Sequence, residues 1–236
     1  MHLVWDWNGT LLDDLHLVVA ATNASLAAFG AGPITAEDHR RDFRRPVADY
    51  YAWVLGRRLD DAEFTRINDV FHDAYLGLLP GARLAGDAPA ALAAWPGTQS
   101  LLSMWIHDAL VPTVSRYGLA ERFLRVDGLR VDRDEVHQHK APHLAEHLTA
   151  MGLGGPDTVL IGDSVDDADA ARAVGARVVL YTGGFTDPDV LAATGFPVAA
   201  SLLDAVHLAT RFGPAVPVQP DRAGRWISRA GRPAPP

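Results

Sequence analysis

The feature that most limits the fold of this chain is an alternation of short apolar runs with amphipathic segments from residue 80 to residue 211. Strands that alternate with helices form parallel βαβ units, so the pattern predicts an α/β fold with a doubly wound, parallel-sheet (Rossmann-like) core. Right-handed crossovers bring the loops after the strands to one edge of such a sheet, where these folds bind ligands. The expected strands cover residues 3–7, 99–103, 123–126, 158–161, 177–181 and 197–200, and the expected helices cover residues 88–95, 107–117, 140–151, 166–174 and 202–211.

The segment between residues 14 and 79 has a different pattern, with apolar residues at helical spacing and no convincing strand. Apolar residues recur every three or four positions from Leu15 to Phe29, and Gly30 ends this helix. Further helices are expected at residues 36–43, 47–55 and 60–79. The chain therefore divides into an α/β core (1–13 and 80–212), an inserted all-helical domain (14–79), and a Pro- and Arg-rich tail (213–236) that we expect to be mobile.

The composition excludes several kinds of chemistry. The 236 residues carry a formal net charge of −8 at pH 7 and include no cysteine, so disulfides, thiolate nucleophiles and thiolate zinc sites are excluded. A negative chain is a poor partner for nucleic acid, whose phosphates attract clustered Lys and Arg. An acidic protein that acts on anionic substrates needs a local positive group, such as a metal ion. Lys140 is the single lysine among 21 basic residues, which suggests a role that arginine would not fill.

The ends and apolar runs of the chain indicate where it acts. The first residues lack the basic and apolar regions of a signal peptide, and no window reaches the ~18 consecutive apolar residues of a membrane span. We therefore expect a cytoplasmic protein that acts on a small molecule and has neither a membrane nor a nucleic acid as a partner.

The strongest chemical signal is the sequence DWNGTL at residues 6–11, which follows the first expected strand. A carboxylate that leaves a buried strand and faces a glycine turn is well placed as a nucleophile or a metal ligand. Gly9 lets the backbone approach a ligand closely, and Thr10 offers a hydroxyl and an amide to an anion. The alternative is that Asp6 only caps the next helix.

Three further positions near strand ends carry polar side chains. Ser103 ends the second core strand, either as a ligand-binding hydroxyl or as a helix N-cap. Asp163 and Asp167 lie four residues apart after an apolar strand, which places them on one side of the first helical turn and suits a hard cation. Acidic residues also favour helix N-termini without any ligand. Lys140 opens the preceding helix, where a solvated lysine is the usual alternative.

In this order, the motifs resemble those of the haloacid dehalogenase superfamily, chiefly phosphatases of its phosphoglycolate-phosphatase-like branch, which carry a helical cap. Residues 6–11 look like the first motif, Ser103 the second, Lys140 the third, and residues 162–167 the fourth. The resemblance spans about residues 1–211, with residues 14–79 as the cap. It implies a Mg²⁺-dependent hydrolase that acts on a small phosphorylated metabolite.

The resemblance also implies roles for single residues. Asp6 would attack the phosphorus and form an aspartyl-phosphate, which splits one difficult step into two. Ser103 and Lys140 would bind the phosphoryl oxygens as charge develops, and the cap would close over the site. Mg²⁺ would be held by Asp6, the backbone carbonyl of Asn8 and Asp163, with support from Asp167.

Asn8 departs from the family's pattern, because these phosphatases usually carry an Asp there that protonates the leaving group and later activates water. An amide cannot exchange a proton at neutral pH, and loss of a general acid or base costs about 10²–10⁴-fold in rate. We favour a phosphatase whose substrate has a good leaving group, or in which Asp13 or His16 supplies the proton. The alternatives are a non-catalytic module that binds a phosphorylated ligand or a protein, and an enzyme that hydrolyses a carbon–halogen or carbon–phosphorus bond.

Two weaker patterns have a functional and a simpler interpretation. Arg45, in the helical insert, is a candidate ligand for an anionic group on the substrate, or half of a solvated pair with Arg44. His139, His143 and His147 repeat every four residues, as in some metal sites, but a solvated helix face is the better interpretation.

Overall fold

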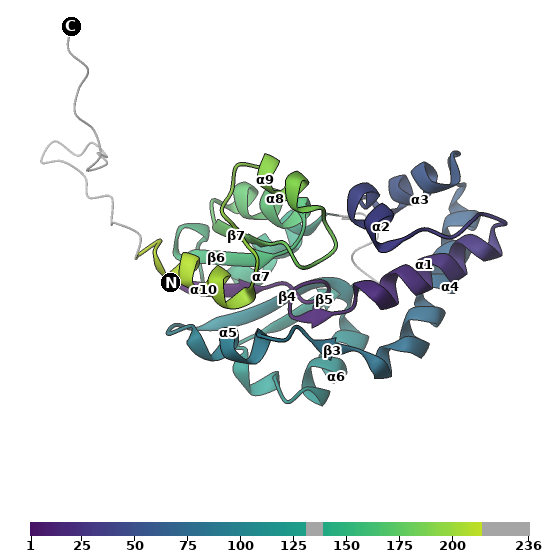
Figure 1. Ribbon diagram of the computed structural model, residues 1–236. Helices are drawn as coiled ribbons and strands as arrows, with labels where there is room; N and C mark the ends of the chain where they lie inside the picture. Colours follow the sequence, from purple (N-terminus) through teal and green to yellow (C-terminus); the bar gives the residue numbers. More distant parts are fainter. Residues whose placement is uncertain (131–138, 214–236) are drawn as a thin grey trace, which may run out of the picture.

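The computed structural model describes residues 1–130 and 139–213, and in this part of the chain six parallel strands form one sheet in the order β5-β4-β1-β6-β7-β8 (Figure 1). The sheet confirms the predicted α/β, doubly wound parallel fold. Its strands are β1 (His2–Trp5), β4 (Gln99–Ile106), β5 (Val126–Leu129), β6 (Thr158–Gly162), β7 (Arg177–Tyr181) and β8 (Val198–Ala199).

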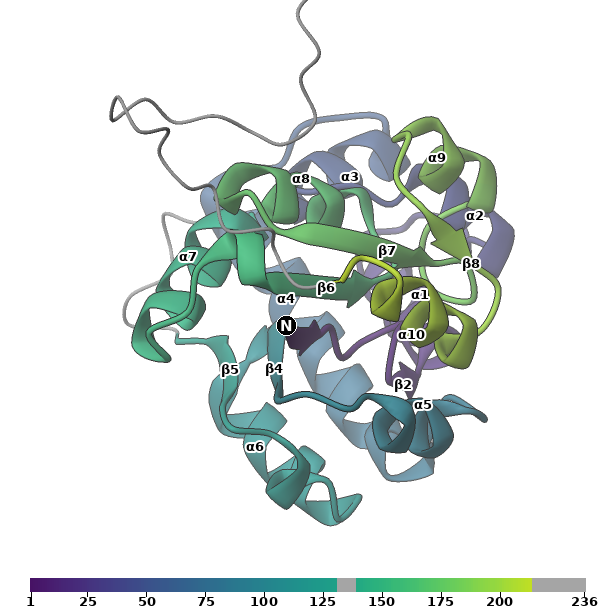
Figure 2. The same cartoon turned by 90° about the vertical axis from the view of Figure 1, so that its left-hand side faces the viewer.

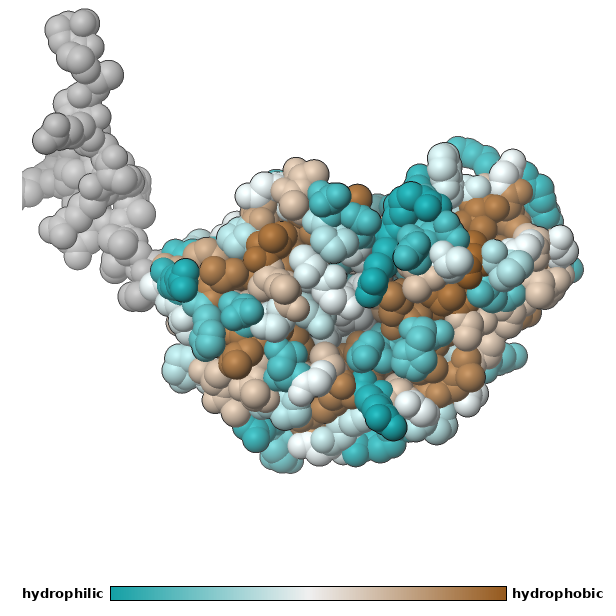
Figure 3. All heavy atoms as spheres, in the orientation of Figure 1, coloured by the Kyte–Doolittle hydropathy of each residue, from teal (hydrophilic) through white to brown (hydrophobic). Residues whose placement is uncertain are grey.

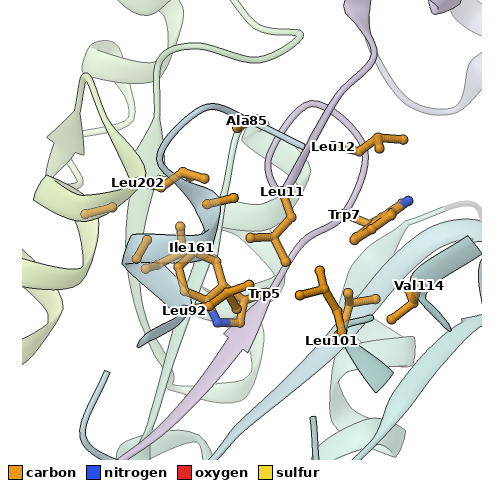
Figure 4. Packing of buried hydrophobic residues seen from close by; sticks show 14 of the residues in the cluster. Trp5, Trp7, Leu11, Leu12, Ala85, Leu92, Leu101, Val114, Ile161 and Leu202 are labelled. Carbon is orange, nitrogen blue, oxygen red and sulfur yellow. The ribbon is translucent and has the colours of Figure 1, made fainter. Parts of the chain in front are cut away.

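Helices cover both faces of this sheet because its strands are apolar on both sides. Successive side chains of a strand point to opposite faces, so Trp5 and Val4 belong to two separate hydrophobic clusters. Trp5 packs with Leu92 and Leu202, which Figure 4 shows together. Figure 2 shows the two helical layers: α5 (Ala88–Ala94), α6 (His107–Arg116) and α10 (Leu202–Thr210) on one face, and α7 (Lys140–Ala150), α8 (Val165–Val174) and α9 (Pro188–Ala193) on the other.

A helical segment, residues 15–78, lies beside this core (Figure 1). The chain enters this segment after β2 (Leu12–Asp13) and leaves it before β3 (Arg83–Leu84). These two short strands pair antiparallel. The segment has its own hydrophobic cluster, built around Leu26, Tyr51 and Ile67. Capping boxes begin the second and fourth of its helices, which are α1 (Leu15–Ala28), α2 (Ala36–Asp42), α3 (Val47–Leu55) and α4 (Asp61–Leu78).

Some elements differ from those expected. The predicted strand at 123–126 is wrong, because β5 begins at Val126, after a 3₁₀ turn at Ala120–Arg122. Strands β2 and β3 have two residues each, too few for alternation to reveal them. The predicted mobile tail lies outside the described residues, apart from Gly213. No helix in the described ranges is long and apolar enough to cross a membrane.

The start of β1, remote from the carboxyl end of the sheet, carries a buried chain of polar side chains. The His2 ring bonds the hydroxyls of Thr98 and Ser100, each at 2.8 Å. Ser100 also bonds Nε2 of His147 at 2.7 Å, and Nδ1 of His147 bonds Asp127 at 2.7 Å. The solvated face expected for His147 is therefore wrong. Burial, and then the charge of His147, lower the pKa of His2 to about 4.

We predict that acid destabilises the protein through His2. Its pKa in the folded state lies below the ordinary value of 6.5, so the unfolded chain binds the proton more tightly. The neutral His2 therefore supports the folded state fully above pH 6.5, and this support is lost as the pH falls toward 4. At pH 5 the free energy of unfolding should be about 2 kcal/mol lower for this reason. Urea unfolding at pH 7.5 and pH 5 should show that His2→Gln removes this part of the difference.

The matched control is His16→Gln, because His16 is exposed in the same chain. It should leave the wild-type loss of stability between the two pH values unchanged. An equally large loss in His2→Gln would show that another group causes the acid sensitivity.

Candidate active site

Three aspartates meet at the carboxyl edge of the sheet. Asp6 follows β1 and Asp163 follows β6, and these strands are neighbours in the sheet. Asp167 lies in the first turn of α8, whose N-cap is Ser164, so Asp163 precedes the helix rather than sharing its first turn. One carboxylate oxygen from each residue lies within 4.8 Å of those from the other two. All three residues are buried, with exposed fractions of 7%, 2% and 1% for Asp6, Asp163 and Asp167.

Lys140 places one positive charge in this acidic cluster. It opens α7, is itself buried, and its ammonium contacts the carboxylates of Asp6 and Asp167. Burial alone would lower the pKa of Lys140, but the two carboxylates hold that pKa above its ordinary value. Burial raises the pKa of Asp6, and burial together with the charges of Asp6 and Asp167 raises the pKa of Asp163.

The cluster fits a hard divalent cation. A cation site needs all three carboxylates ionised, and one ammonium would then leave two negative charges that no other described side chain in the cluster offsets. Mg²⁺ takes oxygen ligands and binds through one or two carboxylates together with the substrate's phosphate. The donor set of Asp6, Asp163 and Asp167 therefore matches the metal that the sequence predicted.

Glycines allow the carboxylates to lie this close to the backbone. Gly9 has a φ of +72°, and a Cβ at this position would collide with the carboxylate of Asp163. A Cβ at Gly162 would collide with the carboxylate of Asp167. Gly9 thus makes room for Asp163, a use that the motif alone did not indicate.

Thr10 does not face a ligand, which corrects the sequence prediction. It is fully buried and is absent from the cavity lining formed by the described residues. Its hydroxyl donates to one carboxylate oxygen of Asp163 at 2.9 Å, and the amide of Phe185 donates to the other at 2.6 Å. Thr10 therefore orients Asp163 instead of binding phosphate.

Asn8 is fixed by hydrogen bonds at both ends of its side-chain amide. Its Nδ2 donates to Asp14 at 2.8 Å and to the Tyr75 hydroxyl at 2.9 Å. The Ser103 hydroxyl donates to its Oδ1 at 3.1 Å. Ser103 lies inside β4, where the pairing with β5 shifts register. Both Asn8 and Ser103 line the cavity.

Asp14 is a member of this network that the sequence analysis missed. It precedes α1 like an N-cap, yet within the described structure its side chain makes no capping bond. Instead it is fully buried and accepts from Tyr75 at 2.6 Å and from the amide of Gly9 at 2.8 Å. Burial raises the pKa of Asp14 to about 6. Asp13 and His16, the expected proton sources, are exposed and do not belong to the described cavity lining.

A cavity of about 830 Å³ lies over the acidic cluster, between the core and the helical segment. Figure 3 shows apolar atoms reaching the surface along this junction. Arg45 lines the cavity and pairs with Asp166 of the core at 3.6 Å. Arg40 donates from Nε to the carbonyl of Gly184 at 2.9 Å. Both arginines thus join the helical segment to the core.

We predict that Asn8→Asp lowers the free energy of unfolding by about 1–3 kcal/mol at pH 8, because a second carboxylate would face the buried Asp14. The exchange variant Asn8→Asp/Asp14→Asn restores one amide and one carboxylate and should recover most of this loss. Urea unfolding of the wild type, both single variants and the double variant measures the coupling. Additive losses would show that the two side chains do not interact.

Comparisons with known proteins agree with this geometry. A family model described as HAD-hydrolase-like matches residues 138–205. A phosphoglycolate phosphatase of Synechococcus elongatus is 29% identical over 206 residues, covering 81% of this chain and 88% of the relative. That of Mesorhizobium japonicum is 29% identical over 199 residues, covering 80% of this chain and 85% of the relative.

The fold also matches solved structures. A haloacid dehalogenase-like hydrolase of Streptococcus pneumoniae superposes with a TM-score of 0.75 at 17% identity, covering 90% of this chain and 98% of that structure. The predicted resemblance to the haloacid dehalogenase superfamily is thereby confirmed: the chain is a phosphatase-type enzyme, similar in sequence to phosphoglycolate phosphatases and in fold to a haloacid dehalogenase-like hydrolase.

Proposed function

We propose that this protein is a Mg²⁺-dependent phosphatase that hydrolyses a small phosphorylated metabolite through an aspartyl-phosphate on Asp6. The observation that carries the proposal is the position of the Asp6 carboxylate. It lines the cavity, contacts the Lys140 ammonium, and has an oxygen within 4.8 Å of oxygens of Asp163 and Asp167, close enough for the three to share a cation.

In the first step, a carboxylate oxygen of Asp6 attacks the phosphorus, and the bond between the phosphorus and the leaving oxygen breaks. Lys140 and Ser103 lie where they can bind the phosphoryl oxygens, since both line the same cavity. In the second step, water attacks the phosphorus of the aspartyl-phosphate, which releases phosphate and restores the Asp6 carboxylate. The helical segment covers the cavity and limits the access of bulk water.

The metal site would use residues already in place. Asp6, Asp163 and the backbone carbonyl of Asn8 would hold Mg²⁺, and Asp167 would support them. When bound, the ion supplies positive charge to the phosphoryl oxygens. Thr10 would support the metal site through the hydrogen bond that it donates to the Asp163 carboxylate.

Asn8 sets a condition on the substrate. Its side-chain amide cannot supply the proton that the leaving oxygen needs, so turnover should be fastest for leaving groups that depart without one. That the protein is cytoplasmic, and that neither nucleic acid nor a membrane is its partner, stay predictions.

We predict that Mg²⁺ stabilises the protein by relieving repulsion among the buried carboxylates. At 100 times the dissociation constant the gain in the free energy of unfolding is about 2.7 kcal/mol. Thermal unfolding with 10 mM Mg²⁺ against EDTA should show an upward shift that Asp163→Asn abolishes. Asp157→Asn, a change remote from the cluster, should keep the shift, and an unchanged shift in Asp163→Asn would exclude this cation site.

We predict Mg²⁺-dependent release of phosphate from a panel of phosphate esters and acyl phosphates, lost in Asp6→Asn by at least 10³-fold. The exchange variant Asn8→Asp/Asp14→Asn should gain about 10²-fold or more on esters with poor leaving groups, and much less on acyl phosphates. Tight binding of phosphorylated ligands without turnover by any variant would instead favour the non-catalytic binding module.

A further inference from the structure

The cavity is much larger than a phosphoryl group needs. Its volume of about 830 Å³ lies at the upper end of the range for small-molecule sites, roughly 300–1,000 Å³. The acidic cluster and Lys140 occupy one part of its lining, on the core. Most of the remaining space adjoins the helical segment and is therefore open to the leaving group.

Aromatic rings dominate this second part of the lining. Two ring clusters are present: His39, Phe43, Tyr50 and Phe185 contact one another at centroid distances of 4.9–6.3 Å, and Phe71, Tyr75 and Trp105 do so at 5.6–5.8 Å. All seven side chains line the cavity. Such rings bind another ring by stacking or edge-to-face contact, an attraction beyond simple burial.

The lining offers little to a second anionic group on the substrate. In the described part of the chain its cationic side chains are Arg45, Arg130 and Lys140. Arg45 pairs with Asp166, and Lys140 with carboxylates of the acidic cluster. Arg130 bonds the ring of His107 at 3.3 Å.

The histidines and aspartates of the lining also disfavour a second anionic group on the substrate. Burial lowers the pKa of His39 to about 4 and lowers that of His72, so both rings are neutral at pH 7. Five aspartates of the described residues line the cavity. A leaving group with its own carboxylate, such as glycolate, therefore finds a poor electrostatic environment.

Three buried polar atoms of the lining have no hydrogen-bond partner among the described residues. They are Nε2 of His39, Nδ1 of His72 and Nε1 of Trp105. His39 and Trp105 are 1% and 7% exposed. These nitrogens are closed off behind the lining, so a ligand in the cavity meets the faces and edges of the aromatic rings and not these atoms.

We propose that the substrate is a phosphate monoester whose leaving group carries a planar aromatic ring. The phosphoryl group binds beside Asp6 and Lys140, and the ring packs among the aromatic side chains that face the helical segment. This inference rests on the proposed function and names its substrate class. Nucleoside monophosphates and substituted pyridine phosphates share such a ring, and the test separates them. Because their leaving oxygens need a proton that Asn8 cannot supply, the test measures binding, and we expect their turnover to be slow.

The test compares esters that share the leaving oxygen but differ in the ring. Calorimetry on Asp6→Asn with Mg²⁺ measures the dissociation constants of adenosine and uridine 5′-monophosphates against ribose 5-phosphate, and of pyridoxal 5′-phosphate against glycerol phosphate and phosphoglycolate. We expect at least one ring-bearing ester to bind tenfold or more tightly than its ring-free counterpart. Whether a nucleotide or pyridoxal 5′-phosphate shows this preference identifies which kind of ring the cavity binds. A smaller preference in every pair, or tightest binding of phosphoglycolate, overturns the inference.

A ring-specific variant adds a second readout. Phe43→Leu should weaken binding of the preferred ring-bearing ester by about three- to tenfold and leave that of ribose 5-phosphate unchanged. Trp53→Leu is the matched control, because Trp53 lies on the same segment but is 60% exposed and outside the described cavity lining. An equal effect of Phe43→Leu on both ligands contradicts the assigned stacking.

Turnover separates this inference from the proposed function. If the wild type releases phosphate but prefers ring-free esters, only the inference fails. If it releases phosphate from neither the esters nor the acyl phosphates of the panel, the proposed function fails, and the calorimetric comparison still decides whether the cavity selects a ring.

Discussion

The rest of the site depends on one electrostatic constraint: three buried carboxylates are held together around a single ammonium. Such a group is stable only if the fold supplies the close contacts and if positive charge offsets the repulsion. Asp6 and Asp163 lie at neighbouring strand ends of the parallel sheet. Glycines leave room for the carboxylates, and Lys140 provides part of the positive charge. The remaining negative charge is what the proposed divalent cation would offset.

The same constraint ties the helical segment to the chemistry. Asp163 is oriented by the amide of Phe185, and the Phe185 ring lies against Phe43 of the helical segment at a centroid distance of 6.3 Å. The carbonyl of Gly184, one residue before Phe185, accepts from Arg40. One loop after β7 therefore orients a carboxylate of the acidic cluster and also contacts the helical segment. The position of the helical segment and the shape of the acidic cluster thus depend on the same loop.

On the other side of the cavity, Tyr75 of α4 reaches Asp14 and Asn8 in the loop that follows Asp6. The amide of Asn8 fits this place because it donates to Asp14 and accepts from Ser103 at once. A carboxylate at position 8 would have to share a proton with Asp14. The departure from the family's pattern is thus matched to its neighbours in this structure, and its backbone carbonyl remains available to a metal.

The sequence by itself determined the parallel α/β fold and the meeting of Asp6, Asp163 and Lys140, because apolar strands buried on both faces and polar residues at strand ends are local patterns. Tertiary structure decided the remaining roles. Thr10 is a residue type that can bind an anion, and Asp14 stands where a helix cap is expected. Their hydrogen-bond partners in the structure, Asp163 and Tyr75, lie 153 and 61 residues away in the sequence. The aromatic cavity likewise arises only where the helical segment meets the core. Local patterns record which side chains leave a strand or start a helix, but contacts between distant segments depend on how the layers pack, which no short stretch of sequence encodes.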